Sequence, residues 1–316
     1  MWTIIEQIFP YAIAFTIPLL ITALGGLFSE RSGVVNIGLE GLMVIGAFSS
    51  ALTVHYLNDK WASHTMVLWA GLFAAIVAGI LFAALHAFAS INLSANQIIS
   101  GTAINLIATA LTIFLARNMT GSGNIRVSGF SPKTIHGVAD IPVIGPLFFT
   151  KTYPTTWFIL IILFASTFIL YKMKFGLRLR SCGEFPQAAE AAGINVRRIR
   201  YAGVLISGAF AGLGGAIIIL TYAGEFTGTV SGLGFLALAS LIFGQWRPLG
   251  ILAATFFFGF ASTIANVSQV IPELSVIPPI LLKIFPYVVT LIALVVFSKS
   301  SQAPKAVGEP FDSAKR

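Results

Sequence analysis

A few polar side chains lie in segments of this chain that are otherwise apolar, and their types suit the binding of a polar solute. Asn36 and Glu40 are four residues apart, so their side chains would share one face of a helix. Asn105 lies about 14 Å along a helix from Asn96, at about 1.5 Å per residue, near the middle of its apolar segment. Burying an amide or a carboxylate in an apolar region is costly unless the group faces a cavity or a partner. Asn36, Glu40 and Asn105 are therefore candidates for a solute pathway.

The same side chains also have a structural interpretation. Asparagine amides inside a helical bundle often bond to neighbouring helices or to backbone groups. Glu40 can pair with Arg31 or satisfy the backbone at the end of a broken helix. Both interpretations stay open from the sequence alone.

Other common kinds of reactive site lack the residues that they need. The single cysteine, Cys182, excludes a disulfide framework and a thiolate cluster. The four histidines include no HExxH motif, and the apolar segments hold no acid pair or Ser/His cluster. The chain also has no GxxxxGK[ST] motif for binding ATP phosphates. We therefore expect no catalytic residue, metal or cofactor in this chain, and an intramembrane enzyme is disfavoured.

The composition identifies the elements that must position the candidate residues. The residues AVILMFWYC make up 57% of the chain and charged residues only 9%, against about 25% charged in a soluble domain. Too few charges are present to coat a surface that faces water, so the bilayer is the expected solvent. The sequence predicts an all-α, polytopic transmembrane helical bundle. We place about nine spans (eight to ten), each of roughly 20 residues, at 10–28, 34–55, 66–89, 96–116, 154–171, 202–222, 233–245, 249–267 and 279–298.

Interruptions within the spans predict that some helices are broken. Glycine and proline interrupt several spans, and the span at 233–245 is short. The two halves of the chain also contain similar motifs. A Gly-Gly pair at 25–26 is followed by GLEGL at 38–42, and a pair at 214–215 is followed by GLGFL at 232–236. These motifs suggest an inverted repeat of the kind found in transporters.

The placement of the charges predicts the orientation of the bundle. Most Lys and Arg residues outside the spans fall on one side if the C-terminus is cytoplasmic. The net charge of +8 then reflects membrane topology, and nucleic-acid binding is disfavoured. We expect a transmembrane domain over 1–300, with an extracytoplasmic loop at 117–153 and a cytoplasmic loop at 172–201. The polar tail at 301–316 is expected to be disordered and cytoplasmic.

The cytoplasmic loop contains the segment FPQAAEAAG at 185–193, which predicts a short helix. Pro186 stands at its first position and Gly193 just beyond its end, which is typical of helix boundaries. A helix of two turns is not stable alone in water. Its alanines leave a slim surface, so we expect it to be stabilised by docking on a partner protein.

Four segments resemble a known family of membrane proteins. GEFPQAAEAAGINV at 183–196 and SGAFAGLGG at 207–215 resemble the coupling loop and the following span of permease subunits of bacterial ABC importers. The similar family comprises the branched-chain amino acid, ribose and simple-sugar permeases. SERSGVVNIGLEG at 29–41 and FGQWRPLG at 243–250 resemble its nucleoside-uptake subgroup. The resemblance covers about residues 15–300.

This resemblance implies a multi-pass permease of the bacterial cytoplasmic membrane that imports nucleosides, above all purine nucleosides, by alternating access. It implies a cytoplasmic ABC ATPase that binds ATP and Mg²⁺ in trans, a second permease subunit in a heterodimer, and an extracytoplasmic nucleoside-binding lipoprotein. The ATPase would dock on a surface of the cytoplasmic loop formed by Glu184, Ala188, Ala189, Glu190 and Gly193.

Two alternatives stand beside the nucleoside importer. A simple-sugar permease of the ribose type shares much of the same motifs. An ion-coupled secondary transporter would place acids deep in its spans, and from the sequence Glu40 is the acid that qualifies.

Overall fold

The structure is a computed structural model, and it describes residues 2–61, 63–267 and 302–312, with 278, 280–282, 284, 285, 288, 289 and 292. These residues form a helical bundle with one short antiparallel pair of strands, β1 (Ile125–Arg126) and β2 (Glu225–Phe226). The α-helices are α1 Trp2–Arg31, α2 Leu39–Leu57, α3 His64–Ala87, α4 Gln97–Thr120, α5 Pro154–Lys172, α6 Lys174–Glu184, α7 Pro186–Ala191, α8 Val196–Ile218, α9 Leu233–Phe243 and α10 Pro248–Val267. Short π-helical turns cover Phe88–Asn92, Gly145–Phe149 and Ile219–Ala223.

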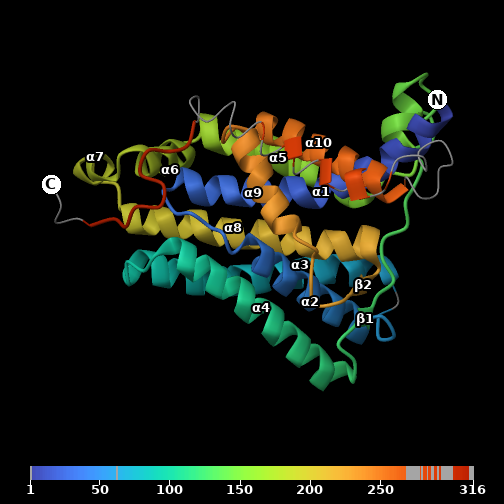
Figure 1. Cartoon of the computed structure of the whole chain (residues 1–316), viewed down its shortest axis with the longest axis horizontal. Helices are drawn as coiled ribbons and strands as arrows, with labels where there is room; N and C mark the ends of the chain where they lie inside the picture. The colour runs from blue at the N-terminus through green and yellow to red at the C-terminus, as the bar shows by residue number, and fades with distance from the viewer. Residues whose placement is uncertain are drawn as a thin grey trace.

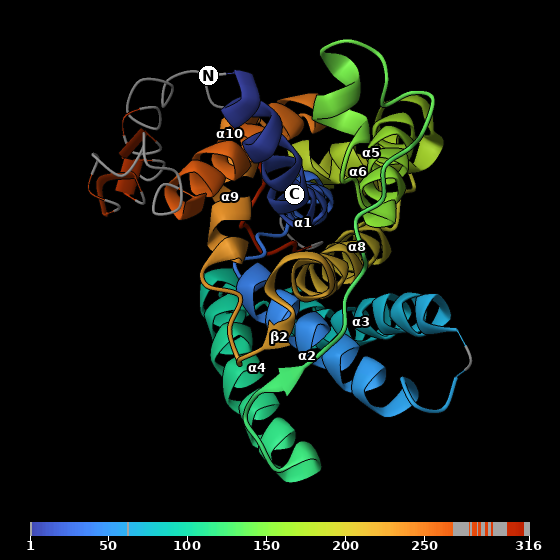
Figure 2. The same cartoon turned by 90° about the vertical axis from the view of Figure 1, so that its right-hand side faces the viewer.

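Helices α1 and α8 form the centre of the bundle. In Figures 1 and 2, α8 lies between α1 on one side and α2 and α3 on the other. Helices α5, α9 and α10 pack around α1, while α4 lies beyond α2. Helices α6 and α7 lie at one end of the bundle, here called the α6–α7 end, and the strands lie toward the other, the β1–β2 end (Figure 1).

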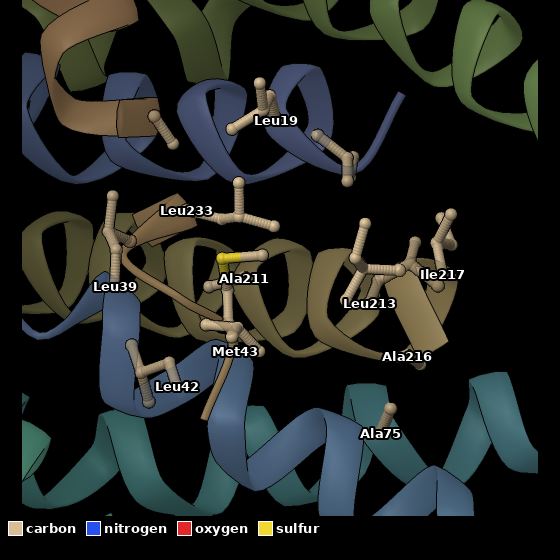
Figure 3. Close-up of a cluster of buried hydrophobic side chains, with 14 of the residues drawn as sticks. Leu19, Leu39, Leu42, Met43, Ala75, Ala211, Leu213, Ala216, Ile217 and Leu233 are labelled. Carbon is tan, nitrogen blue, oxygen red and sulfur yellow. The ribbon is translucent and has the colours of Figure 1, made fainter. Parts of the chain in front are cut away.

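Glycines allow the central helices to approach closely. A Cβ added at Gly46 of α2 would lie 2.1 Å from the carbonyl oxygen of Gly212 in α8. A Cβ at Gly79 of α3 would lie 2.2 Å from the carbonyl oxygen of Gly208. The leucines, isoleucines and alanines of the core interdigitate around these contacts, with Met43 of α2 facing Ala211 of α8 (Figure 3). Such small-residue packing supplies the van der Waals contact that holds helices together in lipid.

The observed helices confirm the predicted membrane bundle with broken helices. Six of the described helices are long and apolar enough to cross a membrane: Ile8–Arg31, His64–Asn92, Gln97–Thr120, Pro154–Lys172, Val196–Ala223 and Pro248–Val267. The predicted spans at 34–55 and 233–245 correspond to α2 and to the short helix α9. The predicted span at 279–298 lies outside the continuous stretches that the structure describes.

The α6–α7 end differs from the prediction in two respects. The amphipathic helix α6 precedes the predicted short helix, and α8 begins at Val196, earlier than the predicted span at 202. The prediction of a disordered tail at 301–316 is wrong for residues 302–312, which pack against this end with Pro304, Ala306 and Phe311 buried. The tail is polar on average, but it is held in place by hydrogen bonds to Gly183 and Gly33 and by the packing of Phe311 in an apolar cluster.

The glycine contact between α2 and α8 yields a prediction. Replacing Gly46 by alanine should destabilise the protein by about 1–3 kcal/mol, because the new methyl group overlaps the backbone of Gly212. Thermal unfolding of the detergent-solubilised protein measures this change. Gly123→Ala is the matched control, since its Cβ would meet only the movable Arg117 side chain at 3.4 Å. Equal melting temperatures for both variants would contradict the packing argument.

Candidate functional site

The helix α9 begins inside the bundle, and Glu40 satisfies its first backbone groups. One carboxylate oxygen of Glu40 accepts a hydrogen bond from the Gly232 N–H at 2.9 Å, and the other accepts one from the Gly234 N–H at 2.7 Å. Glu40 itself lies in the first turn of α2. Both helices begin away from the ends of the bundle (Figure 1). A helix N-terminus has unpaired N–H groups and a partial positive charge, so one carboxylate here stabilises two helix starts.

Glycine makes this contact possible. A Cβ at Gly234 would lie 2.4 Å from the backbone nitrogen and Cα of Glu40. Gly232 adopts a left-handed conformation with φ +81° immediately before α9. The motifs at 38–42 and 232–236 therefore meet in space, each at the start of a helix. Their relation by an inverted repeat stays a prediction.

The two candidate asparagines hold the start of α2 from either side. The Asn36 side chain donates to Ser207 Oγ at 2.9 Å and accepts from the Gly38 N–H at 3.1 Å. The Asn105 side chain accepts from the Gly41 N–H at 2.7 Å and donates to the Ile37 carbonyl at 3.1 Å. The structure thus brings Asn36, Glu40 and Asn105 together, and we call them with Gly232 and Gly234 the α2–α9 junction. All three side chains bond to backbone groups or to a neighbouring helix, as the structural interpretation of the sequence predicted. A role of these residues in the solute pathway stays a prediction.

Further polar side chains of the same region were not selected from the sequence. Gln97 accepts from the Val35 N–H at 2.7 Å, and His86 lies 3.0 Å from the Val35 carbonyl and 2.9 Å from Ser100 Oγ. These contacts fix the connection between α1 and α2, which carries no regular structure. A histidine and a glutamine within or beside apolar spans were a signal that could have found them.

A cavity of about 590 Å³ opens between the end of α8, the start of α9 and the end of α10, within the size range of about 300–1,000 Å³ that is usual for small-molecule sites. We call it the α8–α10 cavity. Its aromatic lining residues are Phe15 and Tyr222, and its polar lining residues are Glu225, Thr227, Thr229, Ser231, Ser262 and Asn266. Among the described lining residues none is Lys or Arg.

Two features of the α8–α10 cavity concern its chemistry and its position. The Asn266 amide donates to the Tyr222 hydroxyl oxygen at 3.1 Å, which leaves the hydroxyl proton for another acceptor. Ser231 and Leu233 line the cavity and flank Gly232, so the cavity borders the α2–α9 junction. The sequence did not reveal this cavity because its walls come from segments that are distant in the chain.

The α6–α7 end is tied to the membrane helices by charged groups. Arg31 at the end of α1 pairs with Glu184 of α6 at 3.5 Å and donates to the Trp246 carbonyl at 2.8 Å. The Trp246 indole in turn donates to the carboxylate of Glu30. Glu30 is 7% exposed and Glu40 is half-buried, so among the described residues Glu30 is a second shielded acid beside Glu40, the acid that the sequence singled out. Arg31 and Glu30 thus each contact Trp246, which lies in the turn between α9 and α10.

The predicted short helix is confirmed as α7, Pro186–Ala191. Gly193 follows it in a left-handed conformation with φ +79°. Ala189 is buried against the rest of the protein, whereas Ala188, Glu190 and Gly193 are exposed. Glu184 is exposed as well, although it pairs with Arg31. Helix α7 therefore presents a small, alanine-rich face to the outside, while its inner face packs against the protein through Ala189.

Comparison with known proteins identifies the family. Residues 8–294 match the family described as "Branched-chain amino acid transport system / permease component". The chain belongs to this permease family. It is 45% identical to the guanosine ABC transporter permease protein NupQ of Bacillus subtilis (strain 168), over 99% of this chain and 98% of that protein. It is 42% identical to the nucleoside ABC transporter permease protein NupC of Lactococcus lactis, over 95% of each chain.

Two more distant matches bear on assembly and fold. NupP, a second guanosine ABC transporter permease protein of Bacillus subtilis, is 29% identical over 81% of this permease and 70% of its own length. The permease also resembles a solved structure described as an inward-facing conformation of a putative metal-chelate type ABC transporter. That match has a TM-score of 0.52 and 16% identity over 92% of this chain and 85% of the other. At this identity the likeness establishes the fold alone.

The α2–α9 junction yields a prediction for Glu40. Glu40→Ala should lower the stability of the permease by at least about 2 kcal/mol, because two N–H groups lose their acceptor in an apolar region. Glu40→Gln keeps one acceptor oxygen and should cost less. Chemical unfolding in detergent measures both, with Asp59→Ala in the exposed turn after α2 as the control. A Glu40→Ala variant as stable as Asp59→Ala would exclude the capping role.

Proposed function

We propose that this permease is the membrane subunit of an ATP-driven importer of nucleosides, with purine nucleosides as the preferred substrates. The near full-length similarity to NupQ and NupC supports the substrate class. The placement of Lys and Arg supports a cytoplasmic α6–α7 end and C-terminus. The α8–α10 cavity then opens toward the outside, where a substrate-delivering protein would meet it.

The occupied N-terminus of α9 is the observation that carries the choice of substrate. In many transporters the positive end of a broken helix receives the anionic group of the substrate. Here the Glu40 carboxylate already fills that position. The described lining of the α8–α10 cavity adds hydroxyl, amide and aromatic groups and the Glu225 carboxylate, but no cation. An amino acid carboxylate would find no cationic partner there, whereas an uncharged nucleoside can stack its base on the aromatic rings and bond its ribose hydroxyls.

The energy for import must come from a partner, because the chain has no phosphate-binding loop. We infer a cytoplasmic ABC ATPase that binds ATP and Mg²⁺ and docks on the exposed face of α7. The exposed residues of this docking surface are Glu184, Ala188, Glu190 and Gly193, and the buried Ala189 supports the surface from within. NupQ and NupP are two such permease proteins of one organism, which supports a second, different permease subunit. An extracytoplasmic nucleoside-binding lipoprotein completes the system.

Alternating access follows from the contacts between the two ends. Closure of the ATPase pair displaces α7, and the Arg31–Glu184 pair transmits this movement to α1 and to the turn before α10. The connection between α1 and α2 leads directly to the α2–α9 junction, which borders the α8–α10 cavity. A shift of α9 against α2 would then open or close that cavity.

Substrate recognition is tested in vesicles that contain the complete transporter. Tyr222→Ala should raise the KM for guanosine roughly thirtyfold, since an aromatic contact and a hydrogen bond are each worth about 1 kcal/mol and every 1.4 kcal/mol is about a factor of ten. Tyr222→Phe should lie between this variant and the wild type. Tyr56→Ala, which removes another partly exposed tyrosine outside the cavity, is the control.

A competition panel of nucleosides, ribose and branched-chain amino acids distinguishes the substrate classes. Inhibition of guanosine uptake by nucleosides alone is expected. Uptake of ribose that nucleosides do not inhibit, without uptake of guanosine, would favour the sugar permease. Uptake by vesicles that lack the ATPase would favour an ion-coupled carrier and contradict the proposal.

Coupling is tested at the end of α7. Gly193→Val should reduce the nucleoside imported per ATP hydrolysed, because a β-branched residue disfavours φ +79° and redirects α7. Replacing Glu190 on the exposed face should act in the same direction, and affinity for the binding protein should stay intact. Gly137→Val is the matched control, since Gly137 has φ +87° in the loop at the opposite end. Unchanged coupling in Gly193→Val would remove α7 from the docking surface.

A further inference from the structure

The C-terminal segment 302–312 crosses the cytoplasmic end of the permease and bonds to two connections and to helix α6. The Gln302 N–H donates to the Gln245 side chain in the turn between α9 and α10, at 3.1 Å. The Ala306 N–H donates to the Gly183 carbonyl of α6 at 2.9 Å, and the Gly308 N–H donates to the Gly33 carbonyl at 3.2 Å. Figure 1 shows the segment in red beside α6 and α7. The segment is therefore placed to fix α6 and these two connections relative to one another.

Phe311 gives the short helix α7 its inner support. The Phe311 ring is 9% exposed and packs in a small apolar cluster with Cys182 of α6, Ala189 of α7 and Val196 of α8. Burial raises the pKa of the Cys182 thiol to about 11, so the thiol is neutral and the cluster carries no charge. A helix of six residues has little stability of its own. The position of α7 consequently depends on what lies beneath Ala189, and that includes Phe311.

Arg200 joins the same segment to the connection between α1 and α2. Its side chain is 2% exposed, and its Nη1 donates to the Glu309 carbonyl at 2.9 Å. The guanidinium carbon lies 5.8 Å from the centre of the Phe311 ring. The guanidinium also lies against Gly33, where an added Cβ would be 2.7 Å from Nη2. Among the described residues Nε and Nη2 have no acceptor, so the C-terminal segment supplies the hydrogen bond and the aromatic face that offset this buried charge.

These contacts form one continuous series across the cytoplasmic end. It runs from α7 through Phe311 and Arg200 to Gly33, and the chain continues from Gly33 to Asn36 and Glu40 at the α2–α9 junction. The Arg31–Glu184 pair is a second link between α6 and α1. Without the C-terminal segment, α6 would keep that link to α1, but α7 would lose its indirect connection to Gly33 through Phe311 and Arg200.

We propose that the C-terminal segment is part of the coupling apparatus, with Phe311 and Arg200 as positioning residues that hold α7 against α8 and the α1–α2 connection. This inference rests on the proposed function, because it assumes that an ATPase docks on α7. Movement of α7 would then be passed to the start of α2 through the segment. A loose α7 would permit ATP hydrolysis that does not drive import.

The test uses the complete transporter in proteoliposomes and measures both guanosine uptake and ATP hydrolysis. In Phe311→Ala the guanosine imported per ATP should fall roughly fivefold or more, the lower end of typical coupling effects, while the ATPase still co-purifies. Phe311→Tyr keeps a ring over Arg200 and should restore coupling. Lys305→Ala, at an exposed position of the same segment, is the control.

A second variant and a second readout separate positioning from general stability. A chain truncated after Gln302 removes the segment without altering a helix, and it should show the same loss of coupling. Hydrogen exchange should become faster in α7 of both variants and stay unchanged in the buried part of α3. Unchanged coupling together with unchanged exchange in α7 would overturn the proposal. If instead the wild-type transporter shows no ATP-driven guanosine uptake, the proposed function itself fails.

Discussion

The bond between the Glu40 carboxylate and the start of α9 is the interaction on which the arrangement of this permease depends. In the interior of a bilayer no water is available for an unpaired N–H group, so a helix that begins there needs an internal acceptor. Glu40 supplies both of its oxygens to Gly232 and Gly234. Because Gly234 must have no side chain for this contact, the register of α9 against α2 is determined. The α8–α10 cavity takes its inner boundary from that register.

Glycine contacts in the bundle and polar contacts at its ends have different effects on movement. The backbones of α2, α3 and α8 touch at Gly46, Gly79 and Gly212, which favours motion of these helices as one body. The connection between α1 and α2 also meets glycines, Gly101 and Gly183, but it is held in addition by individual hydrogen bonds from Asn36, Gln97 and other side chains. Such hydrogen bonds can break and re-form with new partners individually. We therefore expect the connection to rearrange when the transporter changes between its two states.

The family description and the local chemistry point to different substrates. The family is named for branched-chain amino acids, and a solved structure with the same fold belongs to a metal-chelate type transporter. A fold shared by such different systems does not identify a substrate. The described lining of the α8–α10 cavity is more specific, since it combines Tyr222, Asn266 and several hydroxyl groups with the Glu225 carboxylate and no cation, which agrees with the proposed uptake of an uncharged polar molecule. Under the proposed function, the substrate choice of this permease is decided in the lining of the α8–α10 cavity.

Much of this permease follows from its sequence. The apolar spans, the break before 233–245, and the helix between Pro186 and Gly193 follow from local composition, because each depends on residues close together in the chain. The same holds for the choice of Asn36, Glu40 and Asn105, since a polar group in an apolar span is visible without a structure. Their partners are not visible, because Glu40 and Gly232 are 192 residues apart and meet only when the helices pack. The C-terminal segment escaped prediction for the same reason: the order of residues 302–312 comes from Gly33, Gly183 and Arg200, which only the tertiary structure brings beside it.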